Sequence, residues 1–520
     1  MNVTAPPINW AGLAPAIIVL GAGVLGVLVE TFVARRARLI TQATLAVLAI
    51  LAAGVAVVVR WDGLSLPGDG APVAGLTEDP FALAAQGILL IIGFLAVLVM
   101  ADPTTVGDSA FTAQAADRPG SAEESESIHA QWRTTEVFPL TLFSLAGMML
   151  FALASDLVSL FVALELISLP LYIMTATARH RRLLSQEAAL KYFMLGAFAS
   201  AFLLMGAALL YGFSGSVTYS DIAGAIAMGS VVGMDWLLLA GVVLVTVGLL
   251  FKVAAAPFHA WSPDVYQGAP TPVTGFMAAG VKAAAFLALI RFYYVIAGNL
   301  GWDLAPFLWA VAALTMVVGT VVGVVQGDVK RMLAYSAIAH AGYMLIGLLA
   351  LSVAGIQSLL FYALAYGVAT IGAFGVVALV RVSHDGAAGA EATDLESFKG
   401  LGRYHPWLAG AMTVFLLSFA GIPLTSGFIA KFELFVSGVG GGATGLVVLA
   451  IASSAVTAFF YMRLIVLMFF HAPQDGRVVV VESMGPSLSA IGMAVILTVV
   501  LGVVPQAVLM LLSNAAMLVP

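Results

Sequence analysis

The amino-acid sequence predicts an all-α integral membrane protein with about fourteen transmembrane helices, two of which are interrupted. Hydrophobic residues make up 62% of the chain and charged residues only 9%, a composition outside the range of soluble domains. Apolar stretches of about 20 residues, the length that crosses a bilayer, recur along the whole sequence. In two of these stretches proline and lysine occur together, which predicts broken helices with charges inside the membrane.

The apolar stretches define the expected spans and their grouping. The windows cover residues 12–33, 38–59, 81–100, 137–154, 157–177, 189–213, 236–256, 272–296, 305–325, 332–351, 356–382, 407–435, 441–469 and 485–512. The seventh and twelfth windows are both interrupted by proline beside a lysine and lie five spans apart, which indicates an inverted repeat. We therefore expect an N-terminal three-helix segment with a polar loop (1–136), five-helix repeats at 137–300 and 301–470, and a C-terminal helix (471–520).

Lysine and arginine are concentrated in alternate loops. Because cytoplasmic loops carry the excess of these residues, the pattern predicts odd-numbered loops in the cytoplasm and both termini outside. No cation precedes the first apolar run, so we expect a retained helix and not a cleaved signal peptide. The long acidic loop at 102–136 is expected to be a flexible cytoplasmic insertion. The cations in the odd-numbered loops are Arg35, Arg36, Arg38, Arg179, Arg181, Arg182, Lys330, Arg331, Arg381, Lys399, Arg403 and Arg477.

Composition also excludes several functions. The chain has no cysteine, so it has neither disulfides nor a cysteine-ligated iron–sulfur cluster, and electron transfer would have to take place in another subunit. The formal net charge of −6 is small for 520 residues and does not favour nucleic-acid binding.

Four charged residues fall near the middle of predicted spans: Glu165, Lys252, Lys282 and Lys431. Each such charge costs about 2.5–3.5 kcal/mol on insertion scales, so all four are expected to be paired, hydrated or transiently neutral. Desolvation favours neutral lysine and a nearby carboxylate favours the charged form, so the set can pass protons along. Arginine could not do this because it does not deprotonate.

The helix breaks favour a hydrated interior around these charges. Pro257 and Pro423 cannot donate to the carbonyls of Val253 and Phe419, and unsatisfied carbonyls are tolerated only where protein or water reaches them.

Further polar residues have simpler alternative interpretations. Lys191 is either a relay residue or a snorkelling lysine, and His340 is either a relay residue or a core histidine. Lys431 could form an interfacial pair with Glu433, and His259 is expected to pack at the edge of the first break. Lys330 and Arg331 are expected to be loop anchors.

Three sequence blocks resemble a known family. They are KVAAAPFHAWSPDVYQGAPTPVTGFMAAGVKAAAF (252–286), GDVKRMLAYSAIAHAGYM (327–344) and GIPLTSGFIAKFELF (421–435). They resemble the antiporter-like membrane subunits of respiratory complex I, the proton-translocating NADH-quinone oxidoreductase. The segment PDVYQGAPTPV and the lysine at 431 are most similar to subunit N among these. Two features depart from the family pattern: Ala16, where many relatives carry glutamate, and the acidic insertion at 102–136.

The resemblance implies a role for each candidate residue. Glu165 matches the family's fifth-helix glutamate, and Lys252, Lys282 and Lys431 match its lysines of helices seven, eight and twelve. Lys191 matches a sixth-helix lysine and His340 a histidine of the central polar axis. The implied function couples electron transfer from NADH to quinone in other subunits to proton transport through this chain. The alternatives are a subunit of a multisubunit cation/proton antiporter and a structural module that translocates nothing.

The resemblance also implies cofactors and partners. No cofactor is expected in this chain, whereas NADH, FMN, iron–sulfur clusters and quinone are expected in partner subunits. The expected neighbours are an antiporter-like subunit M and small subunits K and J, in a bacterial cell membrane.

Overall fold

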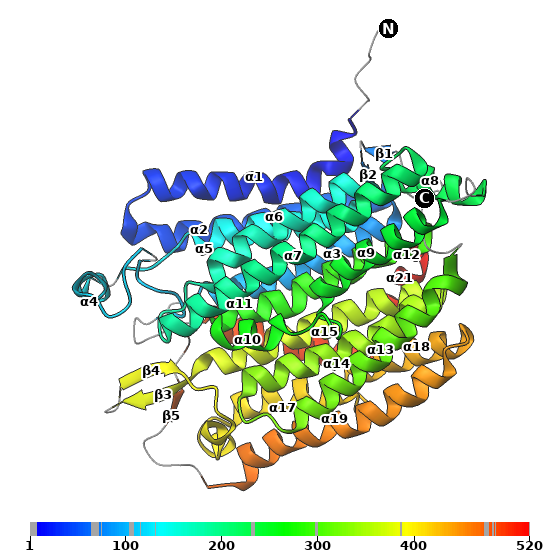
Figure 1. The fold of residues 1–520 in the computed structure, drawn as a ribbon. Helices are drawn as coiled ribbons and strands as arrows, with labels where there is room; N and C mark the ends of the chain where they lie inside the picture. The colour runs from blue at the N-terminus through cyan, green and yellow to red at the C-terminus, as the bar shows by residue number, and fades with distance from the viewer. Residues whose placement is uncertain are drawn as a thin grey trace.

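Long helices lie side by side in the computed structural model and run from one end of the molecule to the other (Figure 1). The structure describes residues 8–63, 72–73, 75–102, 109–114, 116–130, 132–229, 234–296, 300–384, 387–472, 478–480, 483 and 485–518. The all-α membrane fold predicted from the sequence is confirmed.

The first half of the chain contains α1 (Trp10–Phe32), α2 (Arg35–Gly63), β1 (Pro72–Val73), β2 (Leu76–Thr77), α3 (Pro80–Met100), α4 (Ala122–His129), α5 (Val137–Leu153), α6 (Leu157–Thr175), α7 (Arg182–Ser214), α8 (Tyr219–Ala227), α9 (Asp235–Val253) and α10 (Trp261–Gly268). The second half contains α11 (Thr271–Phe276), the π-helix η1 (Met277–Val281), α12 (Lys282–Val295), α13 (Gly301–Val324), α14 (Val329–Leu349), α15 (Val353–Leu379), β3 (Val380–His384), β4 (Ala387–Glu391), the 3₁₀ helix η3 (Leu395–Phe398), α16 (Leu401–Tyr404), α17 (Pro406–Ala420), α18 (Ser426–Gly440), α19 (Thr444–Phe470), β5 (Val478–Val480), α20 (Pro486–Val503) and α21 (Gln506–Ala515).

Twelve helices in the described part of the chain are long and apolar enough to cross a membrane, and each coincides with a predicted window. The other two windows fall on the shorter helix α5 and on the pair α17 and α18. Since α17 and α18 share one window, the predicted interruption of the twelfth span is confirmed, as is that of the seventh between α9 and α10. The count of fourteen spans stays a prediction.

The helices that carry the candidate residues form the centre of the molecule. The most apolar stretches of the span from α11 to α12 and of α15 are 100% buried, and that of α14 is 94% buried. The corresponding stretches of α2 and α7 are only 33% buried, as expected for helices that face lipid or a partner subunit. Charges on α12 and α14 are therefore shielded from the bilayer by other helices.

The two ends of the molecule differ. The start of α1 and the end of α21 lie at one end, whereas α4, β3 and β4 lie at the other (Figure 1). Arg35, Arg182 and Arg331 make their contacts at this second end, which we call the arginine-rich end: they meet Trp132, Glu124 and Asp264, respectively. α1 thus begins and α21 ends at the same end of the molecule, and the placement of both termini on the outer side stays a prediction. Arg477 lies outside the described residues.

Two features at the arginine-rich end were not predicted. Strands β4, β3 and β5 form an antiparallel sheet, in which Arg381 of β3 lies opposite Glu391 of β4 in the strand register. The acidic insertion contains helix α4, and Glu124 in it forms an ion pair of 3.0 Å with Arg182 of α7. In its described part the insertion is therefore attached to the helices, contrary to the expectation of a flexible loop.

Candidate functional site

The first break separates α9 from α10 and is held by side chains that satisfy the backbone around it. α9 ends at Val253, and Ala254 has a left-handed conformation with φ 59°. Trp261 Nε1 donates to the carbonyl of Phe251 at 2.9 Å, and Thr315 Oγ1 of α13 accepts from the amide of Ala256 at 2.9 Å. These contacts supply hydrogen bonds that a continuous helix would make internally.

Lys252 lies in the last turn of α9, directly before this break, and is only 3% exposed. Its Nζ donates to Ser168 Oγ of α6 at 2.7 Å and lies 5.8 Å and 5.6 Å from the ring centres of Tyr172 and Tyr192. Ring faces attract a cation but provide no negative charge. The ammonium therefore has one hydroxyl and two aromatic rings as its near partners.

Glu165 lies on α6, three residues before Ser168, and accepts a hydrogen bond from Ser200 of α7. Glu165 and Lys252 do not form a direct ion pair. Glu165 accepts its hydrogen bond from Ser200 of α7, whereas Lys252 donates to Ser168 of α6. Any interaction between their charges acts through protein of low dielectric, where charges interact more strongly than in water.

Lys282 begins α12, directly after the π-helix η1, and is 2% exposed. Its Nζ donates to the main-chain carbonyl of Ala337 on α14 and lies 6.0 Å from the ring centre of Tyr366. π-Helical turns shift the register of the side chains that follow and are often found at functional sites. Sequence reasoning did not identify this turn, since MAAGV carries no proline or other interruption signal.

His340 is 3% exposed on α14 and belongs to a hydrogen-bonded chain. Its Nδ1 lies 2.7 Å from the Tyr362 hydroxyl and its Nε2 lies 3.4 Å from the Tyr461 hydroxyl, which also bonds with Ser336. Each hydroxyl can both donate and accept, so the chain can pass a proton by reorienting its bonds.

The second break separates α17 from α18, and Lys431 itself fills it. α17 ends at Ala420 and is followed by Gly421 with φ 82°. Lys431 is 5% exposed, and its Nζ donates to the carbonyls of Phe419 and Ala420 at 2.8 Å and 3.1 Å and to Ser454 Oγ at 2.7 Å. The carbonyl freed by Pro423 thus binds the lysine. These partners replace the interfacial pair with Glu433 that was one alternative.

α14 connects the second and third lysines. Its Ala337 carbonyl binds Lys282, its His340 is part of the hydroxyl chain, and its Tyr343 ring centre lies 5.1 Å from Lys431 Nζ. Lys252 lies apart from this group, among side chains of α6 and α7. The predicted row of buried charges therefore consists of two clusters in the structure.

Lys191 lies outside the row. Its side chain is 42% exposed, and it pairs with Glu187 at 2.7 Å and with Asp264 of α10 at 2.8 Å. Burial on its own would raise the pKa of Asp264, but hydrogen bonds from Lys191 and Arg331 and the charges of both outweigh burial and lower it. Asp264 is thus a charged junction of α7, α10 and α14 at the arginine-rich end.

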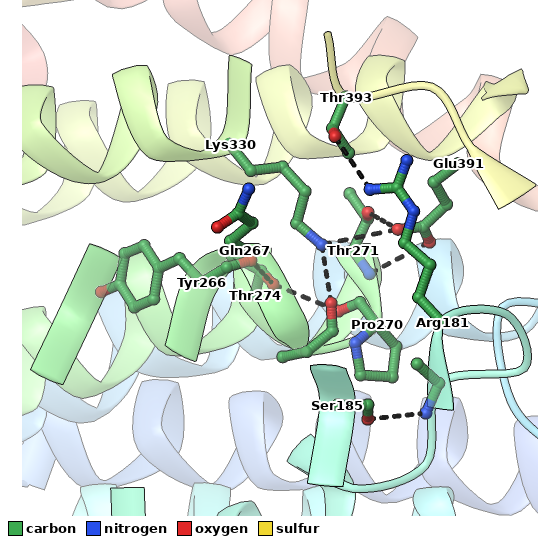
Figure 2. Close-up of polar contacts among 12 residues, drawn as sticks. Arg181, Ser185, Tyr266, Gln267, Pro270, Thr271, Thr274, Lys330, Glu391 and Thr393 are labelled. Atoms are coloured by element: carbon green, nitrogen blue, oxygen red, sulfur yellow. Dashed lines mark hydrogen bonds and ion pairs between the residues drawn. The ribbon is translucent and has the colours of Figure 1, made fainter. Parts of the chain in front are cut away.

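Lys330 is the clearest difference from the sequence-based expectation. It was expected to be a loop anchor, but it is 1% exposed, and its Nζ donates to the carbonyl of Ala269 at 2.6 Å (Figure 2). Glu391 Oε2 of β4 lies 3.4 Å away. This pair could not be predicted, because its members are 61 residues apart and the strand was not expected.

No cluster of potential metal ligands occurs in the described ranges of the chain. Many long apolar helices, two breaks occupied by buried lysines and a central helix that joins them define a class: a multi-pass membrane subunit built like the antiporter-like subunits of complex I.

Comparison with known proteins specifies the family. Residues 154–457 match the family model described as NADH:quinone oxidoreductase/Mrp antiporter, transmembrane. The chain is 51% identical to NADH-quinone oxidoreductase subunit N 3 of Streptomyces griseus subsp. griseus, over 100% of this chain and 96% of that protein. It is 53% identical to NADH-quinone oxidoreductase subunit N of Beutenbergia cavernae, over 99% of both chains. The chain therefore belongs to the subunit N family of NADH-quinone oxidoreductase, the oxidoreductase complex also called complex I.

Solved structures agree with this assignment. A chain of respiratory complex I from Thermus thermophilus with bound aureothin has a TM-score of 0.76 and 32% identity, covering 96% of this chain and 99% of that chain. A chain of the Mrp complex from Dietzia sp. DQ12-45-1b has the same TM-score at 20% identity, over 97% of both chains, which shows a shared fold.

Proposed function

We propose that this chain is a proton-translocating module of a bacterial NADH-quinone oxidoreductase, with both termini on the outer side of the cell membrane. Oxidation of NADH and reduction of quinone take place in other subunits, which hold the FMN and iron–sulfur clusters. The neighbours in the membrane are an antiporter-like subunit M and small subunits K and J. One observation carries the proposal: three lysines at most 5% exposed lie beside two helix breaks and directly after a π-helical turn.

The proton route runs from the cytoplasm to Lys252 and Lys282 and leaves through Lys431. The two five-helix units, 137–300 and 301–470, provide the inner and outer halves of this route. His340 and its tyrosine partners relay protons between Lys282 and Lys431, since they lie on or against the shared helix α14. Lys191, paired with Asp264, belongs to the hydrated cytoplasmic end.

Glu165 controls Lys252. A negative Glu165 stabilises the ammonium form of Lys252, and a neutral or displaced Glu165 releases its proton. The carboxylate is partly exposed on the surface of the chain, whereas Lys252 is enclosed. A charge change in an adjacent subunit can therefore reach Lys252 through Glu165.

The test uses the assembled complex reconstituted in liposomes, with Lys252→Ala and Glu165→Ala variants. Proton pumping per NADH oxidised is expected to fall by about tenfold in Lys252→Ala, because a relay group is lost, and somewhat less in Glu165→Ala. Lys399→Ala, which removes a cation outside the spans, serves as the matched control and is expected to pump normally. Near-normal pumping in both test variants would contradict the mechanism.

A further inference from the structure

The Lys330 and Glu391 pair is a buried ion pair that the proposed route does not use. Snorkelling lysines extend their ammonium groups into water, but Lys330 points inward to the Ala269 carbonyl that precedes α11 (Figure 2). A buried ammonium costs several kcal/mol unless its partners compensate, so its position at the foot of a central helix calls for an explanation.

Glu391 connects Lys330 with the surface. Its side chain is 15% exposed, and it accepts hydrogen bonds from the Thr271 amide, at 3.2 Å, and from the Thr271 hydroxyl (Figure 2). Burial on its own would raise the pKa of Glu391, but the charges of Lys330 and Arg381 and the bonds from Thr271 lower it. The resting pair is therefore a carboxylate outside and an ammonium inside.

A cavity of about 20 Å³ adjoins this carboxylate, between the sheet and the α10–α11 connection. That volume accommodates about one water molecule. Arg381 Nη1 is buried and has no hydrogen-bond partner among the described residues, and Arg381, Gln267 and Glu391 all line the cavity. Water in the cavity would satisfy Arg381 and would also contact Glu391.

On the inner side, Lys330 leads toward the lysine row. It lies seven residues before Ala337 on α14, about 10 Å along the helix, and the Ala337 carbonyl is the partner of Lys282. Lys330 also contacts the start of the span that carries Lys282, through Ala269. The pair thus lies between solvent and the second lysine of the route.

We infer that Glu391 and Lys330 form a proton input station that serves Lys282, beside the entry at Lys252: Glu391 takes protons from water at the arginine-rich end and passes them to Lys330. This inference rests on the proposed function. Glu391 acts as a proton donor and acceptor on a hairpin that was not predicted from the sequence.

The transfer proceeds in three balanced steps. The Lys330 ammonium first gives its proton to the neutral amine of Lys282, which becomes an ammonium, and Lys330 becomes a neutral amine. The charge that held down the pKa of Glu391 is then gone, so the buried carboxylate takes a proton from water in the cavity. The Glu391 carboxyl finally gives this proton to Lys330 Nζ, which restores the carboxylate and the ammonium.

Other charged or titratable groups surround the pair. They are Asp328 at the start of α14, Arg381 on β3, and Arg179, His180 and Arg181 in the connection between α6 and α7. Arg181 is fixed by a 3.0 Å bond to Thr393.

The experiment compares conservative variants in the reconstituted complex. Glu391→Gln keeps a hydrogen-bond acceptor for Thr271 but cannot carry a proton, and Lys330→Arg keeps the ion pair but cannot deprotonate. Both are expected to lower proton pumping per NADH by about tenfold, whereas Glu391→Asp pumps at nearly the normal rate. In Glu391→Ala, azide or formate is expected to restore pumping, because a small weak acid can replace the lost carboxyl in the cavity.

Glu396→Gln is the matched control, since Glu396 lies five residues away on the same connection and pairs with the nearby Lys399. Normal pumping in both Glu391→Gln and Lys330→Arg overturns the inference. The ion pair would then have a structural role only. If Glu391→Gln does not assemble, Lys330→Arg decides, because it preserves the charge. Lys252→Ala separates the two levels: loss of pumping there with normal pumping in Lys330→Arg contradicts only the input station, whereas normal pumping in Lys252→Ala contradicts the proposed function.

Discussion

The two helix breaks carry the same elements, a proline and a lysine, but use them differently. At the first break Trp261 donates a second hydrogen bond to the carbonyl of Phe251, which also accepts from the Ala254 amide, and Lys252 donates to a hydroxyl on α6. At the second break Lys431 itself binds the carbonyls of Phe419 and Ala420. Lys252 thus makes no hydrogen bond to the carbonyls at its break, whereas Lys431 binds two of the carbonyls at its own.

This difference concerns the kind of group that stabilises each ammonium. In the proposed mechanism the ammonium form of Lys252 depends on Glu165, a titratable group that can change its charge, whereas Lys431 is held by main-chain carbonyls and the Ser454 hydroxyl, which do not change their charge. The first break is therefore suited to respond to a signal, and the second offers a fixed site. The variants below test this contrast.

The largest expected effect comes from Lys431→Ala. Besides removing a relay group, it leaves the carbonyl of Phe419 without its donor, at about 1–3 kcal/mol, whereas the carbonyl of Ala420 keeps a hydrogen bond from Ser454 Oγ. We expect both proton pumping and the thermal stability of the complex to fall, measured by quenching assays and by heat-induced dissociation. Lys252→Ala is the comparison: it loses pumping but keeps its stability within about 1 kcal/mol. Equal destabilisation would remove the contrast.

Gly421→Ala is expected to have the next largest effect. Gly421 has φ 82°, and an added Cβ would lie 2.9 Å from Lys431 Cδ, so alanine strains the backbone and displaces the lysine. A left-handed alanine alone costs about 1–2 kcal/mol. We expect pumping to fall several-fold with normal assembly. Gly410→Ala, within α17 and with open space around its Cβ position, is the control and should change neither property.

The helix breaks could be predicted from the sequence, but the partners of their lysines could not. Pro257, Pro423 and the lysines beside them are local signals, so the interruptions and the buried cations could be inferred from the chain alone. The partners of these cations are hydroxyls, rings and carbonyls from distant segments, such as Ser168 and Ser454. No spacing rule relates such pairs, since only tertiary packing brings them together.

For Lys330 the local sequence pattern led to a wrong expectation. A Lys-Arg pair at the start of a helix is typical of a loop anchor, and Arg331 does lie at the surface with Asp264. Lys330 points inward because Glu391, on a hairpin of alanines and glycine, packs over it. A short strand with that composition has almost no β signal, so the partner could not be predicted.

Trp261→Phe tests the closure of the first break with a smaller effect. It keeps the stacking on Tyr192, 4.8 Å between ring centres, but removes the bond to the Phe251 carbonyl. We expect a loss of about 0.5–1.5 kcal/mol in stability, with pumping lowered less than twofold because Lys252 keeps Ser168. Trp236→Phe, a 63% exposed tryptophan on the same helix as Lys252, is the control. A complete loss of pumping in Trp261→Phe would mean that the backbone at this break also positions the lysine.

The smallest expected effect concerns the Asp264 junction and its pH dependence. Because the folded-state pKa of Asp264 lies below its usual value of 3.8, its ion pairs stabilise the contact of α7, α10 and α14 fully above that value, and the stabilisation is lost as the pH falls through the folded-state pKa. Hydrogen exchange of α10 amides should therefore show no pH-specific loss of protection between about pH 6 and 8. Protection should fall at more acidic pH, and high salt should weaken it because the carboxylate is 38% exposed.

Asp264→Asn separates this junction from the lysine row. The variant lacks the charge at every pH, so α10 should exchange faster already at neutral pH while Lys252, which does not contact Asp264, continues to support pumping. If pumping falls as far as in Lys252→Ala, the polar groups of the arginine-rich end and the first break act as one unit. The second break would then be the independent half, because Lys431 depends on neither Asp264 nor Lys191 for its partners.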